Sequence, residues 1–297
     1  MPTITVVIPV FNRAVELRRA LRSLQEQTYT DFECIIVDDG STISIEQIVN
    51  SFKDERFISA RNAENRGPYN ARVQGYRLMR GEFLVGLDSD EEAYPWMLGQ
   101  AVKYLSEVRE VDGVAGMHLS VSDGRLLVRI RDRKRVLHPS EYATLAPIPD
   151  CIGAVRRIVV EEWLQKRDDY FALELHQWFT FHMHHSMLFV EEPWTRHHRD
   201  AADRVSQGVD ARHYDDYVKF LEEHIAYVDG VQSIVLDQVL EDAWFHLWRA
   251  GRKKDAARFE DVMARRGLSK RHAVARRALA KARRHLPVAG TPVTHLE

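Results

Sequence analysis

The chain has 297 residues, with 42 Lys and Arg against 44 Asp and Glu, so its formal net charge is −2. Hydrophobic residues make up 45% of the chain and charged residues 29%, a composition that excludes disordered and fibrous proteins. The near-neutral charge also argues against a protein built around nucleic-acid phosphates.

The length favours about two domains, or one domain with a sizeable appendage. The two cysteines, Cys34 and Cys151, are too few for a disulfide framework and favour a reducing compartment. No apolar run reaches the roughly 18 residues of a membrane-spanning helix, and the first residues enter a strand pattern without a signal-peptide core. We therefore expect a cytoplasmic protein, with peripheral contact at a membrane left open.

The first half of the chain alternates short β-branched runs with amphipathic segments. Strands are predicted at residues 3–9, 32–37, 57–61 and 82–87, and helices at 13–27, 45–52, 67–79 and 95–108. Single helices between successive strands are typical of a mainly parallel sheet with right-handed crossovers. The predicted fold class is therefore α/β.

The remainder of the chain changes character. Strands are predicted at 113–120, 125–130 and 187–190, and helices at 152–164 and 173–185. Residues 131–135 and 139–149 are predicted to be loops, the second with a short helical piece. The last third is helical, with a helix pair at 231–250 and 253–266 that meets at Gly251.

A basic tail follows this helix pair: residues 262–286 contain nine Lys or Arg and no Asp or Glu. Three interpretations remain open. The tail could form a solvated helix face, attract anionic lipid, or bind an acidic partner or nucleic acid. No aromatic residues alternate with the charges, so a dedicated nucleic-acid surface is the least favoured of these.

Four polar segments are expected at the carboxyl edge of the sheet, where open α/β folds bind ligands. They are VVIPVFNR at 6–13, IIVDDGST at 35–42, NRGPYNARVQG at 65–75 and LDSD at 87–90. Each alone is a common turn, but the succession resembles family 2 glycosyltransferases of the GT-A fold, closely over residues 3–120 and more loosely to about 205. The resemblance implies an enzyme that moves a sugar from a nucleotide diphosphate to an acceptor hydroxyl, with inversion at the anomeric carbon.

The resemblance also divides the chain by role. Residues 1–120 would bind the nucleotide-sugar, residues 121–210 would form the acceptor half of the same GT-A domain, and residues 211–297 would be a helical appendage. A UDP-sugar or a dTDP-sugar is the expected donor, because uracil and thymine share the same imide edge. The acceptor could be a small molecule, a glycan or a lipid-linked chain, and a homo-oligomer is left open.

Asp88 and Asp90 form the expected metal site. A carboxylate pair meets a diphosphate only with a divalent cation between them, and Mn²⁺ or Mg²⁺ suits hard oxygen ligands. Such a cation would neutralise charge on the departing nucleotide diphosphate. The resemblance implies that Asp90 is the direct ligand and that Asp88 faces the ribose or the metal. Capping of the following helix is the alternative role of the pair.

The second segment is expected to contact the base. The resemblance implies that Asp39 accepts a hydrogen bond from the imide N–H of uracil or thymine. Asp38 is expected to hold the turn, and Gly40 to allow a backbone conformation that other residues avoid.

Two further segments are expected to line the nucleotide. Pro9 and Phe11 would border the base and the ribose, and Arg13 either joins them or is an exposed residue of the first helical turn. Arg72 would bind base carbonyls or phosphate through its planar guanidinium, or else be a surface charge of its helix.

The acceptor side departs from the family pattern. Inverting transfer needs a general base for the acceptor hydroxyl, and family members usually present a Glu-Asp pair where residues 170–178 have none. Glu174 and His176 are the candidates, the histidine because its unperturbed pKa of about 6.5 suits proton transfer. Asp168, Asp169 or no protein base are the alternatives. The missing pair also leaves a non-catalytic nucleotide-sugar-binding protein as a second function.

A sugar nucleotidyltransferase is a third and weaker candidate, because no Gly-rich loop follows the first strand. Six histidines lie between 176 and 198, but neither cysteine nor an HExxH pattern accompanies them, so a structural zinc site is not expected. Arg196-His197-His198 resembles an Arg-x-His segment of the family. The resemblance implies that Arg196 contacts phosphates and that His198 contacts the metal or a phosphate; polar loop residues are the alternative.

Overall fold

The computed structural model describes residues 1–122, 125–127, 135–139, 153–165, 175–198, 211–230, 234–271 and 273–274. Outside these residues lie several features that the sequence predicts: Cys151, Asp168, Asp169, Glu174, most of the loop at 139–149 and the basic tail beyond residue 274. The chain divides into two units, one of residues 1–142 and 149–216 and the other of residues 143–148 and 217–297.

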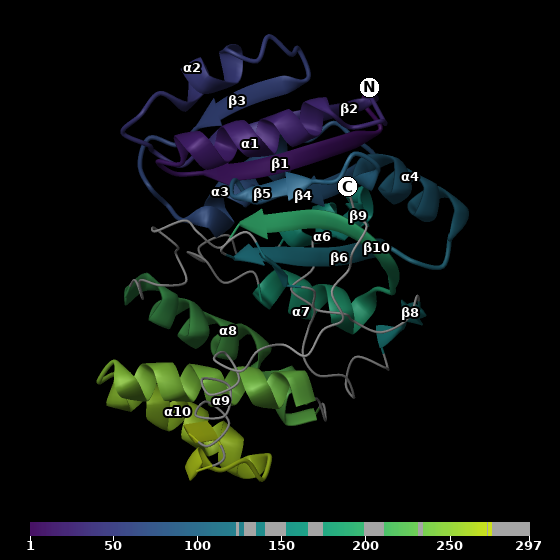
Figure 1. Ribbon diagram of the computed structural model, residues 1–297. Helices are drawn as coiled ribbons and strands as arrows, with labels where there is room; N and C mark the ends of the chain where they lie inside the picture. The colour runs from purple at the N-terminus through teal and green to yellow at the C-terminus, as the bar shows by residue number, and fades with distance from the viewer. Residues whose placement is uncertain are drawn as a thin grey trace. The chain divides into compact units, whose positions relative to one another are not determined.

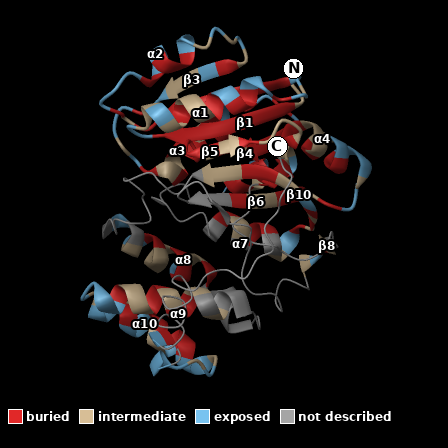
Figure 2. Cartoon of the chain, in the orientation of Figure 1, coloured by how far each residue is buried: buried red, intermediate tan, exposed pale blue. Residues whose placement is uncertain are grey.

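Fully hydrophobic strands form the first part of the sheet. β1, Ile4–Val10, and β2, Phe32–Asp38, are buried at every residue and pair in parallel. β2 also pairs in parallel with β3, Phe57–Arg61, and β1 with β4, Phe83–Gly86. Helices cover both faces of such a sheet, which is why its central strands are buried along their whole length (Figure 2).

The helices between these strands are amphipathic or capped as their sequences predict. α1, Ala14–Gln25, buries Leu17, Leu21 and Leu24 on one face. α2, Ile45–Asn50, begins at Ser44, whose hydroxyl accepts from the Gln47 N–H. α3, Pro68–Leu78, opens with proline, and α4 spans Met97–Glu107. The predicted strands and helices of this half are confirmed to within two residues at each end.

The second part of the sheet is mixed. Its strands are β5 (Glu91–Ala93), β6 (Gly113–Ser122), β7 (Arg125–Leu127), β8 (Arg135–Leu137), β9 (Gly153–Arg156) and β10 (Met187–His198). Among the described residues the strand order is β3-β2-β1-β4-β9-β6-β10-β5, with β7 on β6 and β8 on β10 (Figure 1). β6 and β10 are parallel, whereas β9 runs antiparallel to both β4 and β6. The α/β class is confirmed, and parallel pairing describes β3 to β4 rather than the strands around β9.

β9 replaces the start of a predicted helix. The sequence favoured a helix over 152–164, but Gly153, Ala154 and Val155 are buried strand residues between β4 and β6. A short apolar run carries no periodicity that separates a strand from a helix. Helix α6 then covers Arg157–Leu164, and α7 covers Leu175–His184.

β10 is longer than predicted. The sequence favoured a strand over 187–190 that ends at the following Glu-Glu-Pro, but the strand continues to His198. Its register on β6 shifts around Pro193, which is how a strand tolerates a proline in its interior. The added length pairs Arg196 and His197 with β5, a strand that the sequence did not predict.

The elements that follow β10 in the described part of the chain are all helices. They are α8 (Ala211–Gly230), α9 (Ile234–Arg249) and α10 (Lys253–Arg265). The predicted helix pair that meets at Gly251 is confirmed as α9 and α10. No helix in the described part of the chain combines the length and apolarity needed to cross a bilayer.

Gly116 of β6 and Trp194 of β10 form a close contact in the sheet. Trp194 is fully buried, and its indole N–H donates to Gln100 Oε1 at 2.7 Å. A Cβ on Gly116 would collide with the indole ring. Only glycine therefore leaves room for this tryptophan.

We expect Gly116→Ala to lower the free energy of unfolding by about 1–3 kcal/mol, the usual cost of overpacking a buried site. Chemical denaturation followed by tryptophan fluorescence measures the change. Gly86→Ala is the matched control, because a Cβ on Gly86 of β4 meets nothing within 4 Å. If the two variants had the same free energy of unfolding, β6 would be able to shift away from Trp194 without loss of stability.

Candidate active site

The carboxyl ends of β2, β1 and β4 lie side by side, because these strands are adjacent and parallel. The loops that follow them contain Asp39, Arg13 and Asp88 in turn. The structure therefore brings the predicted segments to one edge of the sheet, as the parallel arrangement requires.

Asn12 joins the first two of these loops. Its backbone N–H donates to Ser41 Oγ at 2.9 Å, and its Oδ1 accepts from the Thr42 N–H at 2.8 Å and the Thr42 hydroxyl at 3.0 Å. Asn12 has a φ of +55°, in the left-handed region that asparagine tolerates better than most residues. Sequence reasoning did not single out this residue.

The second loop is held by its own turn. Asp38 Oδ1 accepts from the Ser41 N–H at 2.8 Å, and its Oδ2 pairs with Arg61. Gly40 has a φ of +77°, and a Cβ there would lie 2.7 Å from the carbonyl carbon of Glu64. Asp38 thus holds the turn, and Gly40 adopts a backbone conformation that other residues avoid, as the sequence predicted.

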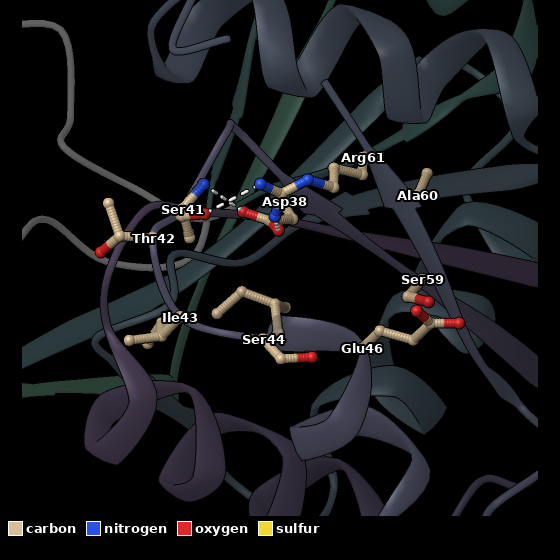
Figure 3. Close-up of a pocket in the computed structure, with 10 residues that line it drawn as sticks. Asp38, Ser41, Thr42, Ile43, Ser44, Glu46, Ser59, Ala60 and Arg61 are labelled. Atoms are coloured by element: carbon tan, nitrogen blue, oxygen red, sulfur yellow. Dashed lines mark hydrogen bonds and ion pairs between the residues drawn. The ribbon is translucent and has the colours of Figure 1, made fainter. Parts of the chain in front are cut away.

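A pocket of about 500 Å³ adjoins this turn (Figure 3). It lies between the start of α2 and the ends of β2 and β3, and Arg61 on its wall also donates to the Ser41 carbonyl at 2.9 Å. Its other lining residues are Asp38, Ser41, Thr42, Ile43, Ser44, Ile45, Glu46, Ser59 and Ala60. None of the predicted nucleotide or metal residues lines this pocket.

Asp39 is buried and accepts three hydrogen bonds from the chain. Asn62 Nδ2 donates to its Oδ1 at 2.7 Å, the Arg66 N–H to the same oxygen at 3.1 Å, and the Gly67 N–H to Oδ2 at 2.7 Å. The carboxylate thereby fixes the loop that leads into α3. A carboxylate offers about four lone-pair sites, and donors within the chain occupy three of them.

Arg13 and Arg72 each contact one carboxylate of the predicted metal site. Arg13 Nη1 lies 2.8 Å from Asp90 Oδ2, and Arg72 Nη2 pairs with Asp88 Oδ1. The side chains of Arg13, Asp90 and Arg72 are 12%, 9% and 9% exposed, whereas that of Asp88 is 47% exposed. The two acids therefore differ: Asp90 is enclosed by the protein and Asp88 is open to solvent.

His197 also reaches Asp90. Its Nε2 lies 3.5 Å from Asp90 Oδ2. Burial alone would raise the pKa of Asp90, but the hydrogen bond from His197 and the charges of Arg13 and His197 outweigh burial and lower this pKa to about 2. Asp90 is therefore a carboxylate at every pH near neutrality.

Glu91 and His118 lie beside the acid pair. Glu91 Oε2 accepts from the Asp88 N–H at 3.1 Å, and its Oε1 lies 3.5 Å from His118 Nδ1. His118 Nδ1 is also 2.8 Å from Thr195 Oγ1, and its ring lies 5.6 Å from that of His197. Burial, and then the charge of Asp88, raises the pKa of Glu91 well above its ordinary value, which favours the neutral acid.

The remaining predicted nucleotide residues lie on β1 and after it. Pro9 is within β1 opposite Val37 of β2, and Phe11 is 42% exposed in the loop that follows β1. An exposed aromatic ring beside Asn12 is available to a ligand at this edge.

The predicted phosphate and catalytic residues are placed differently. Arg196 pairs with Glu92 at 3.2 Å and lies over the ring of Tyr94, so His197 rather than Arg196 faces Asp90. His198 ends β10, and His176 lies in the first turn of α7, but their side chains are not described. Glu174 lies outside the described residues.

The oxygen donors of the acid pair suit a hard dication. Asp88 and Asp90 offer carboxylate oxygens, the ligands that Mg²⁺ and Mn²⁺ prefer. Within the described part of the chain, no three His, Cys, Asp or Glu side chains are grouped so as to hold a metal by themselves. The carboxylate chemistry of Asp88 and Asp90 therefore fits such a cation.

The family model described as glycosyl transferase family 2 matches residues 5–164. The chain belongs to this family, as its motifs predicted. A putative colanic acid biosynthesis glycosyl transferase of Escherichia coli, WcaA, is 36% identical over 96 residues, which are 32% of this chain and 34% of WcaA. A β-1,3-glucosyltransferase of Campylobacter jejuni that acts on GalNAc(5)-diNAcBac-PP-undecaprenol is 33% identical over 110 residues, 36% of each chain.

An uncharacterized glycosyltransferase of Rickettsia bellii is 32% identical over 104 residues, 35% of this chain and 15% of the relative. The matched part thus spans about a third or less of these relatives. Staphylococcus aureus TarS, solved with UDP-GlcNAc, superposes with a TM-score of 0.61 at 19% identity over 82% of this chain and 71% of TarS. This likeness confirms the predicted fold.

We expect Asp39→Asn to lower the free energy of unfolding by about 1–3 kcal/mol without any nucleotide, because an amide cannot accept at both of its ends from three donors. Denaturant titration measures the change. Asp31→Asn is the control, since Asp31 is an exposed carboxylate that accepts from Thr3. If Asp39→Asn were as stable as the unmodified chain, Asp39 would not be needed to fix the loop that leads into α3.

Proposed function

We propose that the chain is a glycosyltransferase that moves a sugar from UDP or dTDP to an acceptor hydroxyl with inversion. One observation carries this proposal: an acid pair, Asp88 and Asp90, lies at the sheet edge of a family 2 chain with two arginines against it. The likeness to TarS, solved with UDP-GlcNAc, supports a nucleotide-sugar as the donor. The relative from C. jejuni supports a hexosyl transfer.

The nucleotide would lie along the loops after β1 and β2. Phe11 offers an exposed ring for the base or the ribose, and Asp39 has capacity for one imide N–H. Uracil and thymine present the same imide, so Asp39 does not distinguish UDP from dTDP. The diphosphate would lie toward Asp88 and Asp90, one strand further along the edge.

A divalent cation, Mn²⁺ or Mg²⁺, is proposed at Asp90 with Asp88 beside it. When bound, it supplies positive charge for the departing nucleotide diphosphate. The chain's own contribution is to keep Asp90 ionised and oriented, through Arg13 and His197. His198 and Arg196 remain predicted phosphate or metal residues.

Inversion follows from one displacement at the anomeric carbon. The acceptor oxygen forms a bond to that carbon as the bond to the nucleotide diphosphate breaks, and a base takes the hydroxyl proton. Glu174 and His176 are the proposed bases. His176 lies in the first turn of α7, the helix that directly precedes β10 and its His197.

We expect UDP or dTDP with Mn²⁺ to raise the melting temperature, because a ligand of the folded state stabilises it by RT ln(1 + [L]/Kd). Asp90→Ala should abolish the part of the shift that depends on Mn²⁺. Asp54→Ala is the control, since Asp54 is a carboxylate paired with Arg56 away from this edge. A Mn²⁺-dependent shift that survives in Asp90→Ala would remove Asp90 from the metal site.

We expect Glu174→Gln to reduce turnover of a UDP-sugar at least about 100-fold, the usual contribution of a general base, while UDP binding stays unchanged. His176→Ala is the paired variant, measured in the same transfer or donor-hydrolysis assay. Loss of turnover in His176→Ala alone would assign the base to the histidine. Donor binding by the unmodified chain without transfer or hydrolysis would instead support the non-catalytic function.

A further inference from the structure

Both acids of the proposed metal site already have a positive partner within the chain. Asp90 is 2.8 Å from Arg13, and Asp88 pairs with Arg72. The two carboxylates and two guanidinium groups form a cluster without net charge. Arg13 and Asp90 are 12% and 9% exposed, so water does little to weaken their ion pair. Asp88 is 47% exposed, so water screens its pair with Arg72 more strongly.

Such a cluster opposes a metal ion that arrives alone. Arg13 and His197 both approach Asp90 Oδ2, at 2.8 and 3.5 Å. A dication bound to that carboxylate would therefore face a guanidinium at close range. Either the cation binds weakly or Arg13 moves away, and a partly buried guanidinium without a counter-ion is unfavourable.

The same cluster opposes a diphosphate that arrives alone. Phosphate oxygens bind arginine through its planar guanidinium. Here Arg13 and Arg72 are committed to carboxylates, and Asp88 and Asp90 would repel the negative phosphates. The diphosphate cannot take the arginines unless another cation takes the acids.

We propose that donor binding is an exchange of ion pairs: the arginines Arg13 and Arg72 pass from the acid pair to the diphosphate as the dication passes to Asp90 and Asp88. This inference rests on the proposed function and concerns how its site is regulated. It makes the metal and the nucleotide depend on each other, because each removes the charge that opposes the other. The nucleotide-free chain is thereby kept from holding metal.

The direct test is Mn²⁺ binding by the nucleotide-free chain, measured by electron paramagnetic resonance. Arg13→Gln should bind Mn²⁺ about tenfold more tightly than the unmodified chain, within the range of typical coupling between sites. Arg18→Gln is the matched control: Arg18 lies on α1, bonds Ser51 Oγ at 3.1 Å and carries the same charge. An equal gain in both variants, or no gain in Arg13→Gln, would overturn the exchange.

The reciprocal test is UDP binding without metal, measured by calorimetry. Asp90→Asn releases Arg13 from its carboxylate, so this variant should bind UDP without metal several-fold more tightly than the unmodified chain. It should at the same time lose the gain that Mn²⁺ gives. Asp54→Asn removes the same charge outside the cluster and should change neither quantity. Unchanged or weaker metal-free UDP binding by Asp90→Asn would contradict the proposal.

The outcomes separate this inference from the function on which it rests. If the unmodified chain binds UDP with Mn²⁺ but Arg13→Gln gains no affinity for Mn²⁺, the exchange is wrong and the donor site stands. If the unmodified chain binds neither UDP nor dTDP with Mn²⁺, the proposed function itself fails. Circular dichroism and melting curves of each variant establish that the folded chain is being compared.

Discussion

A carboxylate enclosed by protein needs positive charge beside it, and this requirement organises the edge of the sheet. Asp90 obtains that charge from Arg13 after β1, with His197 of β10 at 3.5 Å, and Asp88 obtains it from Arg72 of α3. These partners come from parts of the chain that are far apart in sequence. The acid pair is therefore a point at which side chains from the loop after β1, from α3 and from β10 meet.

The strands and helices of the first half could be predicted from the sequence, because the hydrophobic pattern of each segment agrees with its place in an alternating α/β fold. Buried β-branched runs alternate with amphipathic helices, and turn residues separate them. The end of each strand or helix is therefore indicated both by the change in hydrophobic pattern and by the turn residues. The sequence also indicated Asp88, Asp90, Arg13 and Arg72 as candidate site residues. Their pairing was not indicated, because a sequence shows which charges exist but not which of them become neighbours.

Strands β9 and β10 of the second half were harder to predict, and the reasons lie in their residues. Gly153, Ala154 and Val155 form a strand too short to have a period. Pro193 normally ends a strand, so the continuation of β10 across it, and with it the position of His197, was missed. Once β10 is extended, alternation of side chains places Thr195 and His197 on the same face.

The remaining missed residues had weaker signals. Asn12 could have been found from the tolerance of asparagine for a positive φ, in a sharp turn after a strand. Glu91 and His118 belong to β5 and β6, which lie on either side of β10 and so bring the two residues together only in three dimensions. No spacing rule in the sequence connects them.

Two residues, His185 and Ser186, separate the helix that begins near His176 from the strand that ends at His197 and His198. β10 is then fixed along its length by pairing with β6, β8 and β5. An insertion at this junction would therefore leave His197 facing its carboxylate partner. It would instead turn and shift α7, and with it His176, relative to the sheet edge.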